Sequence, residues 1–223
     1  MLLKLNILSP QSTEWILYMN FNVFASFMIF VVFLIWLQYE IKKHTRYDEK
    51  KEKEFRTREE KANATRKQSL DGLNYITIPM ETFPMYLMTD NETIKEYHEV
   101  LEHLAQEKIV NLTGISNTDL KLEYGVANLP ILTHYDQCYT QLARTLQGWA
   151  TCLYENGYET ECIPILEFAI DTNTDISGTY KLLAEIYVKN GDKAKLDALK
   201  TKTENLNSAM KKPIDRMLQE FDL

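Results

Sequence analysis

The chain has 223 residues, and its 25 Lys or Arg against 32 Asp or Glu give a formal net charge of −7 at neutral pH. An acidic balance argues against nucleic acid as a partner, because binding to nucleic acid depends on clustered basic residues that neutralise phosphates. The three cysteines are odd in number and lie within apolar helical patterns, which favours reduced packing residues over a disulfide framework.

A long apolar span lies near the N-terminus. Residues 15–39 read WILYMNFNVFASFMIFVVFLIWLQY and contain no charged side chain. A helix needs about 20 such residues to cross the hydrocarbon core of a bilayer. A cleaved signal peptide would have a shorter apolar region and small residues at the cut, neither of which is found here. We therefore expect a short tail, residues 1–14, then a single transmembrane helix over 15–39, with the lipid bilayer as its partner.

Basic residues are distributed unevenly around this span. Residues 41–58 contain eight Lys or Arg, whereas Lys4 is the only one before the span. Because basic residues are retained on the cytoplasmic side, this imbalance predicts a single-pass protein of the cell membrane with its N-terminus outside. The C-terminal domain is then cytoplasmic.

A charged stalk, residues 40–70, follows the span and is expected to continue its helix, because residues 41–70 contain no Pro or Gly. Residues 41–67 carry eleven basic and six acidic side chains, whereas residues 68–223 carry thirteen basic and twenty-four acidic ones. An anionic leaflet attracts the first group and repels the second, so the acidic part should stand off the membrane. We interpret the stalk as a spacer; lipid recognition and a coiled coil are the alternatives.

An extended segment, residues 71–90, comes next and contains Pro79 and Pro84. Its short β-branched stretch, residues 75–78, cannot be stable alone, so it should lie along a helical body or pair with a partner chain. Apolar residues then recur with helical spacing over 93–106. His98 and His103 are five residues apart on that predicted helix, whereas ligands on one helix face are three or four apart, so we expect solvated histidines.

Two segments near the C-terminus superimpose with an offset of 34 residues. Leu146, Trp149, Ala150, Leu153 and Gly157 fall on Tyr180, Leu183, Ala184, Tyr187 and Gly191. Each segment resembles the first helix of a tetratricopeptide repeat, which has this period. The resemblance implies repeats at about 143–176 and 177–210 and a capping helix at 211–223, within an all-α domain over 91–223. The small residue expected early in the second helix is Cys162 in one copy but Leu196 in the other, and no third copy is detectable.

Residues 74–79 and 114–125, NYITIP and GISNTDLKLEYG, resemble signatures of membrane-anchored proteins from Gram-positive bacteria that have no assigned activity. That resemblance also implies a helical-repeat domain in the cytosol.

The tetratricopeptide resemblance further implies a partner-binding surface, because the first helices of such repeats line a concave groove. On this chain the implied contact residues for a protein or peptide are Arg144, Gln147, Thr151, Tyr154, Lys181, Glu185 and Lys189. Glu185 stands where a carboxylate-clamping repeat has Asn, so a receptor for chaperone tails is not expected. The alternative for each residue is an ordinary solvated helix face.

Enzyme signatures are weak. His134 and Cys138 are four residues apart and could bind a metal or form a Cys–His pair, but no second pair of ligands lies at a useful spacing. Glycine-rich phosphate loops are missing from the sequence. We therefore predict a protein that is not an enzyme, without catalytic residues, cofactor or metal. The predicted function is a membrane-anchored scaffold or adaptor; the alternatives are an accessory subunit acting through its transmembrane helix and a peptide-sensing regulator.

Overall fold

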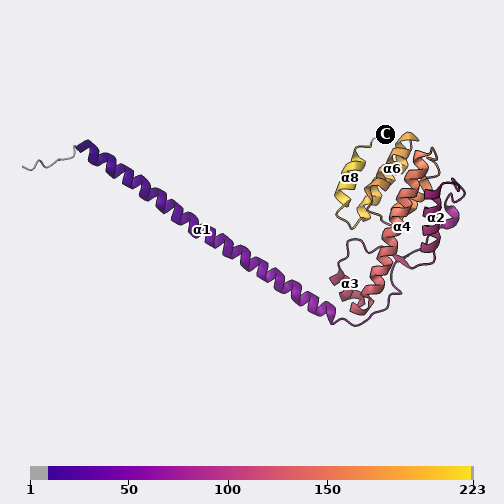
Figure 1. Cartoon of the computed structure of the whole chain (residues 1–223), viewed down its shortest axis with the longest axis horizontal. Coiled ribbons are helices and arrows are strands. Elements are labelled where there is room, and N and C mark those ends of the chain that lie inside the picture. The colour runs from indigo at the N-terminus through magenta and orange to yellow at the C-terminus, as the bar shows by residue number, and fades with distance from the viewer. Residues whose placement is uncertain (1–9, 222–223) are drawn as a thin grey trace, which may run out of the picture. The chain divides into compact units, whose positions relative to one another are not determined.

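The computed structural model describes residues 10–221, and the side chains of residues 23–45 and 47–221. Most of the predicted tail 1–14 lies outside the described residues. Helices dominate the described part, which confirms the predicted all-α class (Figure 1). The elements are α1 (Pro10–Asn63), β1 (Tyr75–Ile76), η1 (Met80–Thr82), α2 (Glu92–Leu104), β2 (Ile109–Val110), α3 (Asn117–Tyr124), η2 (Val126–Asn128), α4 (Leu129–Glu155), α5 (Ile163–Asp171), α6 (Ser177–Lys189), α7 (Lys193–Lys202), η3 (Thr203–Asn205) and α8 (Lys211–Gln219).

The chain divides into two compact units, one ending at Glu59 and the other, here called the body, comprising Glu60–Leu223. In its described residues, from Pro10 onward, the first unit is a single helix, because α1 runs from the predicted span into the stalk without a break. By length and composition, α1 is apolar enough to cross a membrane. Its apolar side chains from Val23 to Tyr39 are mostly exposed, with Val23 at 65% and Ile29 at 71%. The helix ends at Asn63, before the predicted end of the stalk at residue 70.

The core of the body surrounds Trp149 of α4, whose side chain is fully buried. The ring of Phe83, from the segment that contains the two prolines, meets the Trp149 ring edge-on with 5.7 Å between centroids. Leu101 of α2, Leu183 of α6 and Ile214 of α8 are buried in the same cluster. One core therefore joins the helices on both sides of α4, including the helix predicted over 93–106.

The predicted extended segment pairs within its own chain. β1 and β2 are antiparallel, with Tyr75 opposite Val110 and Ile76 opposite Ile109. Ile78 and Phe83, which follow β1, are buried in the core of the body. Of the two predicted alternatives, packing along the helical body is therefore the one observed.

Two helix pairs, α4 with α5 and α6 with α7, occupy the region of the 34-residue offset. α6 begins at Ser177 and α8 at Lys211, close to the predicted starts of the second copy and of the capping helix. Gly157 and Gly191 have φ values of +87° and +70°, the left-handed conformation that ends a helix after a C-cap. α4 begins at Leu129, well before the predicted start of the first repeat copy near residue 143.

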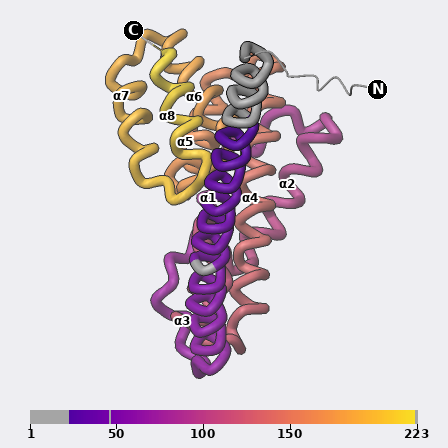
Figure 2. The backbone as a smooth tube through the Cα atoms, turned by 90° about the vertical axis from the view of Figure 1, so that its left-hand side faces the viewer, coloured from indigo at the N-terminus to yellow at the C-terminus, as the bar shows by residue number. Residues whose placement is uncertain are grey.

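α3 and η2 hold the chain that follows α1. The backbone N–H of Gln68 donates to the carbonyl of Tyr124 at 2.9 Å. Gly125 ends α3 with φ +85°, and a Cβ there would lie 2.4 Å from the carbonyl oxygen of Arg66. Figures 1 and 2 place α3 near one end of α4, with α6 and α8 toward the other. The segment 114–125 thus forms a close contact with residues 66–68 inside the body.

Candidate functional site

The predicted partner-binding surface lies on α4 and α6, which are neighbours in the body. The hydroxyl of Thr179, at the start of α6, donates to Oε1 of Gln147 on α4 at 2.6 Å. At the other end of α6, the ammonium of Lys189 donates to the carboxylate of Glu159, just after α4, at 2.6 Å. Gln147 comes before Glu159 in the chain, just as Thr179 comes before Lys189. The two helices therefore run parallel, side by side.

Not all the predicted contact residues are available on this surface. Gln147 is half-buried, and its Nε2 donates to the hydroxyl of Thr151 at 3.0 Å. Tyr154 is also half-buried and packs against the core. The structure therefore gives Gln147, Thr151 and Tyr154 packing contacts of their own, and it places Gln147 in the joint between α4 and α6.

The charged members of the predicted surface are more exposed. Arg144, Lys181 and Lys189 are exposed, whereas Glu185 is half-exposed and lies 3.8 Å from the Lys181 ammonium, one turn away. The Glu159 carboxylate, which accepts from Lys189, raises the pKa of that ammonium above its ordinary value. We use the name α4–α6 face for the predicted contact surface that carries Arg144, Lys181 and Glu185. It carries charges of both signs.

α2 packs against another side of α4. Gly148 makes this approach possible, because a Cβ there would lie 2.6 Å from the hydroxyl oxygen of Tyr97 on α2. His98, also on α2, meets the Trp149 ring edge-on at 4.9 Å, and its Nε2 is buried without a hydrogen-bond partner in the described residues. Burial lowers the pKa of His98. The prediction of solvated histidines was therefore wrong for His98, whereas His103 is exposed.

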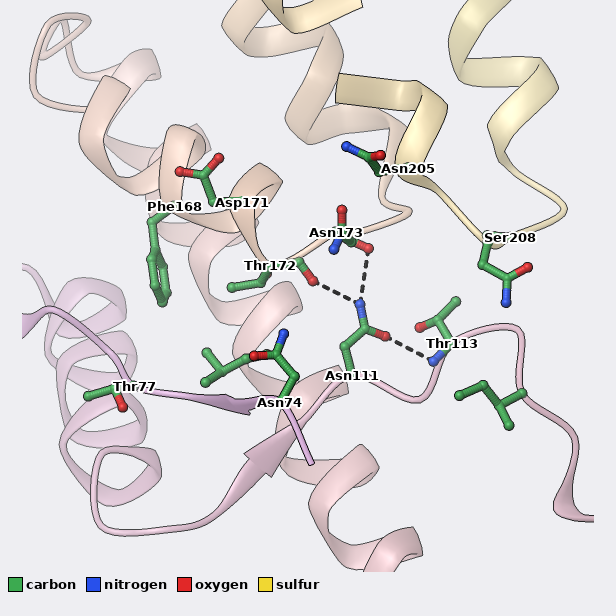
Figure 3. A pocket seen from close by; sticks show the side chains of 13 residues that line it. Asn74, Thr77, Asn111, Thr113, Phe168, Asp171, Thr172, Asn173, Asn205 and Ser208 are labelled. Carbon is green, nitrogen blue, oxygen red and sulfur yellow. Dashed lines mark hydrogen bonds between the residues drawn. The ribbon is translucent and has the colours of Figure 1, made fainter. Parts of the chain in front are cut away.

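A polar pocket of about 420 Å³ lies where the end of α5 meets the β1–β2 pair and the loop before α8 (Figure 3). Asn111 lies at its centre, where its Nδ2 donates to the carbonyls of Thr172 at 2.8 Å and Asn173 at 3.1 Å. The Oδ1 of Asn111 accepts from the backbone N–H of Thr113 at 2.9 Å. One side-chain amide thus joins the chain after β2 to the end of α5.

The pocket offers mainly neutral hydrogen-bonding groups. Asn74, Asn205 and Asn207 line it together with Asn111 and Asn173. Its acidic lining residue, Asp171, has a carboxylate that accepts from the ammonium of Lys202. Sequence reasoning missed this pocket, because the asparagines come from four separate segments and no spacing rule connects them. The quoted stretches 74–79 and 114–125 border it without indicating its chemistry.

Glu107, His134 and Cys138 form a second cluster, outside the pocket. Nε2 of His134 lies 3.2 Å from Oε2 of Glu107 and 3.8 Å from Sγ of Cys138. The three potential ligand atoms all lie within 4.8 Å of one another. Burial, together with the Glu107 carboxylate, raises the pKa of the Cys138 thiol. The sequence indicated His134 and Cys138 by their spacing, but Glu107 is brought to them by the turn between α2 and β2.

The likeness to tetratricopeptide repeats rests on the 34-residue offset and on the two successive helix pairs, and it stays a prediction. The likeness to membrane-anchored proteins of Gram-positive bacteria also stays a prediction. No family model, curated protein or solved structure matches the chain.

Proposed function

We propose that the protein is a membrane-anchored scaffold or adaptor whose cytoplasmic body binds another protein through the α4–α6 face. The observation that carries the proposal is the parallel pairing of α4 and α6. Two hydrogen bonds hold it, one from Thr179 to Gln147 and one from Lys189 to Glu159. The same parallel arrangement is expected for the first helices of neighbouring tetratricopeptide repeats.

The apolar part of α1 supports membrane anchoring. In the described residues its side chains are exposed around the helix, as for Phe24 at 63% and Phe27 at 61%. A helix that is apolar all round is stable in lipid, where its backbone groups are satisfied internally. The basic residues after the span favour retention of that end in the cytoplasm.

The charges of the α4–α6 face support a polar partner segment. Arg144 and Lys181 offer donors to carboxylates, and Glu185 offers an acceptor one turn from Lys181. Exposed ion pairs contribute little to stability, about 0–1 kcal/mol, so these side chains can exchange partners at small cost. Complementary charges of this kind mainly set specificity and association rate.

Site-specific crosslinking in intact membranes tests the proposal. A photoreactive side chain is placed in the full chain at Arg144 or Lys181, and at the exposed Asp197 on α7 as the control. We expect one crosslinked protein from the first two positions and none from Asp197. The charge reversals Arg144→Glu and Lys181→Glu should weaken the crosslink without unfolding the body, because both side chains are exposed.

Replacement of residues 15–39 by an unrelated transmembrane sequence separates the scaffold from the accessory subunit. The scaffold requires that the crosslinks from Arg144 and Lys181 persist after this replacement. Their loss would favour an accessory subunit that acts through its transmembrane helix. Equal labelling at all three positions would also contradict a specific α4–α6 face.

A further inference from the structure

The Glu107, His134 and Cys138 cluster combines three different metal-ligand types at one point of the surface. His134 and Cys138 lie on successive turns of α4, and Glu107 comes from the turn between α2 and β2. Cys138 is buried, whereas His134 and Glu107 reach it from the solvent side and also contact each other. We propose that Glu107, His134 and Cys138 form a binding site for a divalent ion of the zinc type.

Two of the separations, both measured from Nε2 of His134, are close to those between zinc ligands. With Zn–N and Zn–O distances of about 2.0–2.2 Å and a Zn–S distance of about 2.3 Å, tetrahedral angles place the nitrogen about 3.4 Å from the oxygen and about 3.6 Å from the sulfur. The structure has 3.2 Å from His134 Nε2 to Glu107 Oε2 and 3.8 Å from the same nitrogen to Cys138 Sγ. Small rotamer changes accommodate the ion.

Ion binding and hydrogen bonding use different states of His134. Nε2 donates to Glu107 when it carries a proton, whereas an ion binds the lone pair of the deprotonated Nε2. A cation between the three atoms engages the imidazole lone pair, the carboxylate and the thiolate together. Binding releases the thiol proton of Cys138 to solvent.

The ligand types select the ion. A thiolate with an imidazole favours zinc and similar transition metals, whereas magnesium and calcium prefer sites made of oxygen. The His134 side chain is 54% exposed and that of Glu107 is 34% exposed, so the site opens to solvent. Three protein ligands leave a fourth position for water or for a donor group of another molecule. The ion would also link α4 to the turn that carries Glu107.

Cobalt substitution is the direct test, because Co²⁺ reports a thiolate ligand by its charge-transfer absorption. The full chain is purified in detergent micelles without a histidine tag, under reducing conditions, and titrated with Co²⁺. We expect one equivalent to produce the charge-transfer band together with the intense visible bands of a tetrahedral ion. Addition of Zn²⁺ should abolish both. A wild-type protein without these bands would overturn the proposal.

Matched variants assign the ligands. Cys138→Ser should remove the charge-transfer band, and His134→Gln and Glu107→Gln should each weaken Zn²⁺ binding by about tenfold or more, since even second-shell changes cost about that much. Cys152→Ser, His103→Gln and Glu102→Gln change the same residue types elsewhere and should leave binding intact. A band that survives His134→Gln and Glu107→Gln unchanged would show adventitious binding to a cysteine and would overturn the site.

Thermal unfolding provides a second measurement, and it requires no substitution at the buried Cys138. Zn²⁺ that binds the folded state should raise the unfolding temperature of the wild-type full chain. The same addition should leave His134→Gln unchanged, and this variant should fold because its side chain is exposed. An equal shift in both proteins would contradict the proposed site.

Discussion

The side-chain amide of Asn128 donates to the carbonyl of Gln68 at 2.8 Å and to the carbonyl of Tyr124 at 2.7 Å. Asn128 is fully buried, and the two carbonyls belong to segments about sixty residues apart in sequence. This single side chain therefore joins the chain that follows α1 to the end of α3.

Replacement of Asn128 should destabilise the body. Asn128→Ala leaves the Gln68 and Tyr124 carbonyls without this donor, which should cost about 1–3 kcal/mol of unfolding free energy. Asn128→Asp should cost more, because it sets a buried carboxylate against two carbonyl oxygens. Denaturant unfolding of the full chain in micelles measures both, with the exposed Asn190→Ala as the control. Equal stability of all three variants would contradict the contact.

Two glycines with the same sign of φ provide a matched comparison. A Cβ at Gly157 would have nothing within 4 Å. Gly157→Ala should therefore lower the free energy of unfolding only by the cost of a left-handed alanine, about 1 kcal/mol. In Gly125→Ala the new Cβ meets the Arg66 carbonyl, and the backbone at φ +85° and ψ 148° is essentially restricted to glycine, so the unfolding temperature should fall further. The measurement is thermal unfolding of both variants. Similar losses would mean that residues 66–68 are not held closely by the end of α3.

The joint between α4 and α6 should contribute to stability. Thr179 is fully buried, and Thr179→Val keeps its shape but removes the donor to Gln147, at a cost of about 1–2 kcal/mol. Thr201→Val on the exposed face of α7 is the control and should change stability by about 0.5 kcal/mol or less. Arg144→Ala should likewise leave the unfolding free energy nearly unchanged. A large loss in Arg144→Ala would show that this residue packs the fold rather than contacting a partner.

Stability should fall in alkaline solution. Burial, followed by the Glu161 carboxylate, raises the pKa of the Cys162 thiol from 9.0 to about 12, and burial raises the pKa of Tyr139 from 10.0 to about 12. Between these values the unfolded chain loses its protons first, so the folded chain binds more protons and loses stability as the pH rises. Well below pH 9 these groups stay protonated in both states, so they should not make the stability depend on pH.

Thermal unfolding between pH 8 and pH 11 measures this dependence, under reducing conditions. Cys162→Ala should flatten the fall above about pH 9, whereas Cys152→Ala, at a half-buried position, should change it less. A stability that rises with pH over this interval would contradict burial of these groups.

Short-range patterns predicted much of the fold. The 34-residue offset located the start of α6 and the helix ends at Gly157 and Gly191, because helix periodicity and left-handed glycines are local properties. The apolar spacing after Thr93 likewise located α2. These features depend on neighbouring residues, so a single sequence records them.

Contacts between distant segments were not predictable in the same way. Gln68 was expected inside the stalk, but its N–H bonds to Tyr124, and α1 ends earlier at Asn63. The pairing of Tyr75 with Val110 and the arrival of Glu107 beside His134 likewise depend on how the helices pack. All seven predicted partner contacts were inferred from the same resemblance to tetratricopeptide repeats. Only the structure shows that Gln147 lies in the joint between two helices, whereas Arg144 is exposed.

The central claim is that α1 anchors the body on the cytoplasmic side of a membrane, and protease protection in sealed cells that express the full chain tests it most directly. A protease added outside should leave residues 91–223 intact, and the same protease should digest them once the membrane is opened. Digestion of this region in sealed cells would place the body outside, and it would contradict both the orientation and the cytoplasmic scaffold.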